Sequence, residues 1–184
     1  GITVILDDIL LPVVEVCQLP CMLGAHHINE VYFTGAWVPD QDVLGEVNQG
    51  WKIVNEVLAL ERIGIARYAR CDKLLSWAPE AMGEAWCELP AALHQRWAKA
   101  LVHSRAVRLL AYKVVAAQDR GNLDPADAAA YRIAVTLLDQ EVAEVCMEIV
   151  GGWGLGTEDT ERLFERAVED HWRYAQASTV ASGT

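Results

Sequence analysis

The chain has 184 residues, of which 53% are hydrophobic and 22% are charged, and its formal net charge is −11. This composition predicts a globular protein and excludes a disordered chain. The acidic balance and the lack of a Lys and Arg cluster argue against nucleic-acid binding, which relies on cationic contacts to phosphates. No apolar run reaches the roughly 20 residues needed to span a bilayer, so we expect no membrane span.

Residues 1–45 have the character of β-strands. Short runs rich in β-branched and aromatic residues are separated by prolines and glycines, as in GITVILDD, VVEVC and EVYFTGAWVP. The chain lacks an initiator Met and starts inside such a run. We therefore expect a fragment of a longer protein in which this segment is the end of a β domain.

The pattern becomes helical from Trp51 onward and predicts a helix over 51–77. This helix contains the stretch VLALERIGIARYAR, in which Glu61 lies within an apolar stripe. The apolar residues spaced three or four positions from Glu61 or from one another are Val54, Val57, Leu58 and Ile65.

Two interpretations of Glu61 are open at this point. A carboxylate on an apolar face loses solvation, which raises its pKa and suits it to act as a general base. Alternatively, Glu61 is an ordinary helix residue that pairs with Arg62 or Arg67 or faces solvent at the edge of the stripe. The periodicity alone favours the ordinary role.

Three further helices follow a break marked by Pro79, Gly83 and Pro90. The spacing of apolar residues predicts helices over 91–118, 125–150 and 158–174. Asp124 is the expected N-cap of the second of these helices, and Pro125 suits its first position. Their lengths and short connections predict most of an antiparallel four-helix bundle.

The five cysteines give no sign of a metal site. They are scattered and odd in number, without a CxxC pair or a histidine at metal-ligand spacing. We expect reduced, buried thiols and no metal.

The order of the motifs resembles the carboxyl-terminal half of the acyl-CoA dehydrogenase family. NEVYFTGAWVPDQDVLG is followed by GWKIVNEVLALERIGIAR, then by helices, EIVGGWGLG and a final SGT. The resemblance implies an α+β fragment that is mainly α: 1–45 as the end of the middle β domain, and 46–184 as the four-helix bundle without its last helix.

The resemblance also implies a reaction. The family removes hydrogen across the α,β bond of an acyl-CoA thioester: a carboxylate takes the α proton, and a hydride moves from the β carbon to FAD. Electrons then pass to an electron-transferring flavoprotein. These expectations imply a homo- or heterotetramer that is cytoplasmic in a bacterium or, alternatively, lies in the mitochondrial matrix.

The family carries its catalytic carboxylate at one of two positions. Most members have a Glu in a Glu-Gly-Thr loop near the carboxyl end, and a minority have a Glu before Arg in the first bundle helix. Here Ser182 occupies the loop position and Glu61 the helix position. The resemblance therefore implies that Glu61 is the base and that Ala59, Leu60 and Arg62 border the acyl-CoA.

The same resemblance implies FAD contacts from Glu148, Gly151, Gly152 and Thr184. The alternative for the glycines is a simple helix stop, as is common for Gly-rich breaks. Glu148 departs from the family, which has Gln there, and a carboxylate is a poor neighbour for a pyrophosphate.

Two more departures lie after the first bundle helix. The family commonly places an Arg and a Phe-Gly pair there, which reach the FAD of the neighbouring subunit, whereas this chain has Cys87 and Pro90. A heteromer similar to the steroid-side-chain members would account for these losses, because a partner chain would supply the missing contacts. The rival interpretation is a catalytically silent partner subunit.

Overall fold

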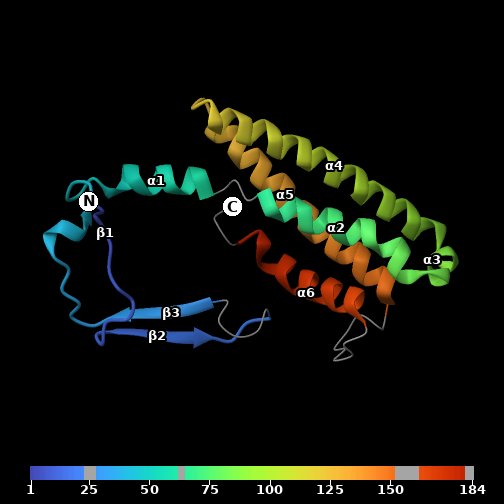
Figure 1. The fold of residues 1–184 in the computed structure, drawn as a ribbon, viewed down its shortest axis with the longest axis horizontal. Helices are drawn as coiled ribbons and strands as arrows, with labels where there is room; N and C mark the ends of the chain where they lie inside the picture. Colours follow the sequence, from blue (N-terminus) through green and yellow to red (C-terminus); the bar gives the residue numbers. More distant parts are fainter. Residues whose placement is uncertain (23–27, 62–64, 152–161, 181–184) are drawn as a thin grey trace. The chain divides into compact units, whose positions relative to one another are not determined.

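The computed structural model describes the whole chain except residues 23–27, 62–64, 152–161 and 181–184 (Figure 1). The chain forms two compact units, Gly1–Leu60 and Glu61–Thr184. The predicted domain boundary between residues 45 and 46 stays a prediction.

The first unit contains two antiparallel strand pairs and one helix. Strand β1 (Val4–Ile5) pairs with β4 (Val43–Leu44), and β2 (Val14–Leu19) pairs with β3 (Ile28–Phe33). The short 3-10 helix η1 (Asp40–Asp42) precedes β4, and helix α1 (Gly50–Glu61) follows it. The expected strand character of this segment is confirmed.

The β2–β3 hairpin carries an apolar patch at one end of one of its faces. The register pairs Val14 with Phe33 and Val16 with Val31 on this face. Because strand side chains alternate, Glu15 and Glu30 lie on the other face, which they share with apolar and aromatic side chains such as Tyr32. Val16, Val31 and Phe33 are all exposed in this chain, so the apolar patch has little cover among the residues that the structure describes.

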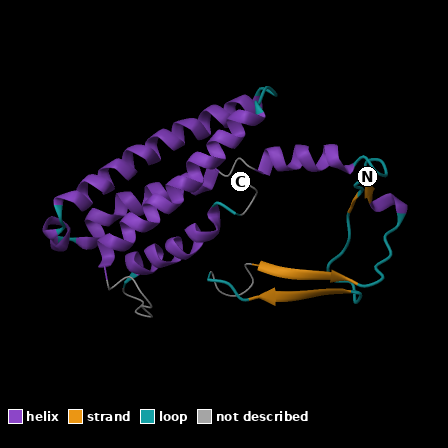
Figure 2. Ribbon diagram, turned by 180° about the vertical axis from the view of Figure 1, so that it is seen from behind, coloured by secondary structure: helices purple, strands orange, loops and turns teal. Residues whose placement is uncertain are grey.

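The second unit is a helical bundle. Its helices are α2 (Ile65–Met82), the short α3 (Glu84–Glu88), α4 (Ala91–Asp119), α5 (Pro125–Val150) and α6 (Leu163–Ser178). Figure 2 shows the four long ones lying side by side. Helix α5 contacts α2, α4 and α6 and carries the largest set of buried side chains, so it forms the centre of the bundle.

The helix ends follow from local chemistry. Gly121 adopts φ +68° just after α4, a conformation that glycine tolerates best. The Asp124 side chain accepts a hydrogen bond of 2.8 Å from the backbone N–H of Ala126, and Pro125 occupies the first turn of α5. These observations confirm the predicted boundary between the second and third bundle helices.

Pro79 does not end its helix, in contrast to the predicted break. Helix α2 continues through Pro79 to Met82. Proline lacks the N–H that would bond to the carbonyl of Leu75, four residues earlier. The indole Nε1–H of Trp97, on α4, donates to this carbonyl at 2.9 Å and replaces the missing donor.

The core of the bundle confirms the predicted apolar faces. On α5, the apolar residues whose helical spacing predicts this helix are all at most 3% exposed: Val135, Leu138, Val142, Val145 and Ile149. On α4, three of the six apolar residues expected on one face are buried, Leu93, Val107 and Val114, and the other three are partly buried: Trp97, Leu101 and Leu110. Among the described helices none is long and apolar enough to cross a membrane.

Candidate functional site

Glu61 is the last residue that the structure assigns to α1, and its side chain is exposed. Its apolar neighbours on the same helix are open as well, since Val57 is 56% and Leu60 55% exposed. Val57 lies four residues before Glu61, so both side chains occupy one face of α1. The described residues therefore place the carboxylate beside an open apolar surface rather than inside a dry pocket.

The structure describes only some of the other residues that are expected beside the acyl-CoA. Leu60 lies in α1 as expected, and Ala59 contributes its backbone to the same helix. The side chain of Ala59 and the whole of Arg62 lie outside the described residues. Their role in substrate binding stays a prediction.

The expected FAD contacts lie at the carboxyl end of α5. Glu148 is exposed and forms an ion pair with Arg96 of α4. Gly151 ends the helix with φ +58°. Gly152 and Thr184 lie outside the described residues.

The role of these residues in FAD binding stays a prediction. As an ionised carboxylate, Glu148 only accepts hydrogen bonds, here from Arg96, and so offers no donor to a pyrophosphate. Cys87, in α3, is exposed, and Pro90 precedes α4. Neither side chain supplies the cation that a flavin phosphate needs at these two positions.

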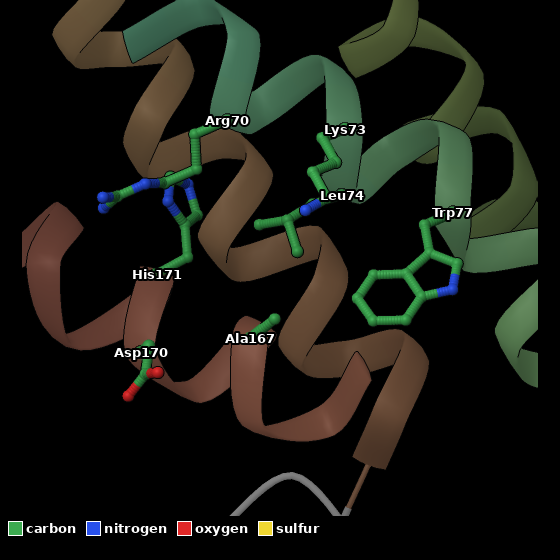
Figure 3. Close-up of a pocket in the computed structure, with 7 residues that line it drawn as sticks. All are labelled: Arg70, Lys73, Leu74, Trp77, Ala167, Asp170 and His171. Atoms are coloured by element: carbon green, nitrogen blue, oxygen red, sulfur yellow. The ribbon is translucent and has the colours of Figure 1, made fainter. Parts of the chain in front are cut away.

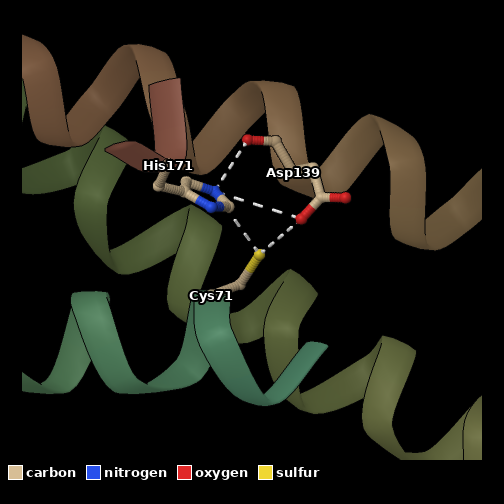
Figure 4. Close-up of side chains that lie close together, drawn as sticks. All are labelled: Cys71, Asp139 and His171. Atoms are coloured by element: carbon tan, nitrogen blue, oxygen red, sulfur yellow. Dashed lines mark hydrogen bonds and ion pairs between the residues drawn. The ribbon is translucent and has the colours of Figure 1, made fainter. Parts of the chain in front are cut away.

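A buried polar cluster, which sequence reasoning missed, joins three helices in the bundle interior. The Cys–Asp–His cluster consists of Cys71 from α2, Asp139 from α5 and His171 from α6 (Figure 4). The Cys71 thiol donates to Asp139 Oδ1 at 3.3 Å, and its sulfur lies 3.9 Å from His171 Nε2. That same Nε2 lies 3.2 Å from the backbone carbonyl oxygen of Asp139. All three side chains are at most 1% exposed.

Burial dominates the ionisation of the cluster. It raises the pKa of Asp139, although the bond from Cys71 and the nearby arginines oppose this shift. Burial and the nearby Asp139 charge raise the pKa of the Cys71 thiol. Burial, with Arg70, lowers the pKa of His171 to about 4. At neutral pH the cluster therefore contains a neutral imidazole and a protonated thiol.

Arginines border this cluster. Arg67 Nη1 lies 3.9 Å from Asp139 Oδ2. Arg132 donates to the carbonyl of Ser178 at 3.0 Å, and Arg67 donates to the same carbonyl at 3.4 Å. The end of α6 is thus bonded to both α2 and α5.

A cavity of about 250 Å³ lies between α2 and α6, next to the cluster (Figure 3). Arg70 stacks its guanidinium 4.6 Å from the ring centre of Tyr174 at this side of the bundle. The cavity is lined by Arg70, Lys73, Leu74, Trp77, Ala167, Asp170 and His171. His171 therefore belongs both to the cluster and to the cavity wall.

The sequence held a weak signal for the cluster. His171 falls on the face of α6 that Phe164, Val168 and Ala175 bury, and Asp139 directly follows Leu138 on the buried face of α5. A polar residue at a buried position of a helical repeat needs a partner. The pattern along the chain does not reveal which helices supply that partner.

Residues 48–184 match the family model described as acyl-CoA dehydrogenase, C-terminal domain. Acyl-CoA dehydrogenase FadE34 of Mycobacterium tuberculosis is 28% identical over 184 residues, which cover 100% of this chain and 24% of that protein. FadE29 from the same organism is 32% identical over 149 residues, which cover 76% of this chain and 37% of that protein. The chain therefore spans less than half the length of these curated relatives.

Solved structures share the fold. A variant of the Tcur3481–Tcur3483 steroid ACAD superposes with a TM-score of 0.85 at 25% identity, covering 100% of this chain and 48% of that chain. The ChsE4–ChsE5 complex from Mycobacterium tuberculosis gives a TM-score of 0.79 at 22% identity, with 100% and 48% covered. At such identity the second likeness is one of fold.

Proposed function

Because this chain belongs to the acyl-CoA dehydrogenase family, we propose that it is part of a subunit that dehydrogenates an acyl-CoA thioester, with Glu61 as the base. One observation carries the proposal. Of the two positions at which the family places its carboxylate, the loop holds Ser182, and the helix holds Glu61. A serine hydroxyl cannot replace a carboxylate base at neutral pH.

The surroundings of Glu61 support this role. Val57 and Leu60 form an open apolar surface beside the carboxylate, which suits an acyl chain. Covering this surface with substrate and with the rest of a longer protein would remove water from Glu61. Desolvation favours the neutral acid and brings a carboxyl group closer to the pKa that a general base requires.

The remaining partners follow from the same proposal. The acyl-CoA would contact Ala59, Leu60 and Arg62, and an electron-transferring flavoprotein would accept the electrons. FAD, which receives the hydride in this family, would be held mainly by parts of the complex beyond the described residues. Cys87, Pro90 and the paired Glu148 favour a heterotetramer over a homotetramer, because a different chain would then complete the flavin site.

A second candidate function rests on Cys87, Pro90 and Glu148, the three positions that depart from the family. A chain without donors toward the flavin of its neighbour could be a silent subunit that only shapes the oligomer. This alternative predicts that Glu61 has no chemical task. The two functions therefore differ in what a change at Glu61 does.

The test is Glu61→Gln in the full-length protein with its natural partner chains. We expect flavin content and ligand binding close to wild type, and reduction of the flavin by acyl-CoA slowed by about 10²- to 10⁴-fold, the usual contribution of a general base. Glu56→Gln is the matched control, because Glu56 is an exposed glutamate of the same helix. It should bleach the flavin at the wild-type rate.

Anaerobic loss of flavin absorbance after mixing with acyl-CoA gives the rate. A wild-type rate in the Glu61→Gln complex would contradict the assignment of the base. Failure of the wild-type complex to reduce any flavin with a range of fatty and steroid acyl-CoA thioesters would favour the silent subunit.

A further inference from the structure

We propose that the Cys–Asp–His cluster binds one divalent zinc-type ion inside the helical bundle. The three side chains come from α2, α5 and α6, and each offers one ligand atom. Neither the family reaction nor the role of Glu61 uses this cluster. A negative result for the metal site would therefore leave the proposal for Glu61 unaffected.

The distances between the ligand atoms suit a tetrahedral ion. Zinc bonds of about 2.3 Å to sulfur and 2.0–2.2 Å to nitrogen or oxygen separate neighbouring ligand atoms by roughly 3.2–3.6 Å. In the cluster, sulfur and Oδ1 are 3.3 Å apart, sulfur and Nε2 3.9 Å, and Nε2 and Oδ1 4.0 Å. Side-chain shifts of about half an ångström would close the set around one ion.

Two buried polar atoms of the cluster lack the hydrogen bonds that buried groups normally make. Asp139 Oδ2 and His171 Nδ1 have no hydrogen-bond partner among the described residues. Arg67 approaches Oδ2 only to 3.9 Å, beyond hydrogen-bond distance. Neither atom is one of the three ligand atoms, so an ion held by sulfur, Oδ1 and Nε2 would leave both of them to be satisfied by water.

The donor set selects zinc over harder cations. A thiol, an imidazole and a carboxylate suit zinc, whereas calcium and magnesium prefer oxygen alone. Binding would release the Cys71 thiol proton to solvent, so that sulfur binds as the thiolate. His171 would bind through Nε2 as the neutral tautomer that carries its proton on Nδ1, and it would give up the hydrogen bond that an Nε2–H donates to the Asp139 carbonyl oxygen at 3.2 Å.

The charges balance once the thiol is deprotonated. Thiolate and carboxylate together carry two negative charges, which match the divalent ion. Arg67, Arg70 and Arg132 all act on Asp139, and their positive charges oppose a bare cation. Because of this repulsion, the ion binds only when the Cys71 thiol loses its proton. Cations with little affinity for thiolate should therefore not bind at this site.

The cavity beside His171 gives the ion a route to the cluster. His171 belongs to both the cluster and the cavity wall. Its imidazole therefore separates the proposed metal site from the cavity between α2 and α6. Three protein ligands leave a fourth position, which a water molecule would fill.

The test uses the full-length protein with its partner chains, freed of metal by a chelator and then dialysed against Zn²⁺ or Co²⁺. We expect about one zinc per copy of this chain by elemental analysis. The cobalt form should show intense tetrahedral bands and a thiolate-to-cobalt charge-transfer band. Cys71→Ser should abolish the charge-transfer band and weaken zinc binding by at least about tenfold, since even outer-shell changes cost that much.

Cys146→Ser is the matched control, because Cys146 is a buried cysteine of α5 outside the cluster. It should retain the zinc and the band. No bound zinc in the wild type, or an unchanged band in Cys71→Ser, would overturn the proposal. Should Cys71→Ser fail to fold, X-ray absorption on the wild-type zinc form decides: one sulfur in the shell supports the site, and a shell without sulfur refutes it.

Discussion

The hydrogen bond from Trp97 to the carbonyl of Leu75 explains how α2 passes through Pro79. In Trp97→Phe this carbonyl loses the indole donor that lies 2.9 Å away, and Pro79 has no N–H to replace it. An unsatisfied buried acceptor costs about 1–3 kcal/mol. Loss of the indole contact with Trp86, at 5.0 Å between ring centres, adds about 0.5–1.5 kcal/mol. We expect Trp97→Phe to destabilise the bundle by roughly 2–4 kcal/mol.

A second substitution isolates the hydrogen-bond part of this cost. Pro79→Ala restores a backbone N–H four residues after Leu75, so the carbonyl gains its ordinary helical donor. In the Pro79→Ala background, Trp97→Phe should therefore cost about 1–2 kcal/mol less than in the wild type.

Urea unfolding followed by circular dichroism measures all four proteins of this cycle without relying on tryptophan fluorescence. Trp86→Phe is the control, because it changes the ring contact without touching the Leu75 carbonyl, and its cost should be the same in both backgrounds. If the cost of Trp97→Phe also agrees in the two backgrounds within about 0.5 kcal/mol, the indole does not compensate for the proline.

Three further outcomes follow from the bundle. Asp124→Ala removes the N-cap of α5 and should lower the free energy of unfolding by about 0.5–2 kcal/mol in urea titrations; no change would mean that the cap is redundant. Leu138→Ala should cost about 2–5 kcal/mol in the same assay, because Leu138 is 2% exposed, whereas the neighbouring Leu137→Ala, at 57% exposure, should cost far less; equal costs would contradict the assigned core. In thiol titrations near neutral pH, exposed Cys87 should react quickly, while Cys146, whose pKa burial raises to about 12, should react only after unfolding; fast reaction of Cys146 in the folded protein would contradict its burial.

The sequence predicted the bundle helices well where local signals agree. The α5 helix starts at Pro125 and ends at Val150 as expected, because the Asp-Pro start and the glycine stop act within a few residues. The break at Pro79 was wrong for a physical reason. The donor that replaces the missing N–H belongs to Trp97, 22 residues after the Leu75 carbonyl, and a local rule cannot include it.

The two candidate sites also differ in how far the sequence alone could predict them. Glu61 was found because a family motif surrounds it in the sequence, and its catalytic role stays a prediction. The Cys–Asp–His cluster was missed because its members are 68 and 32 residues apart along the chain. Only the packing of three helices brings them together, and no fixed spacing in the sequence identifies such a site.

The β2–β3 hairpin affects how this chain behaves alone at high concentration. Among the described residues each of its strands pairs on one side only, so each keeps an open edge of backbone donors and acceptors. Such edges recruit strands from other molecules, and the exposed Val16, Val31 and Phe33 would strengthen that association. Glu15 and Glu30, on the opposite face, oppose it by mutual repulsion between copies. High salt screens that repulsion, and self-association of the isolated chain should begin at this hairpin.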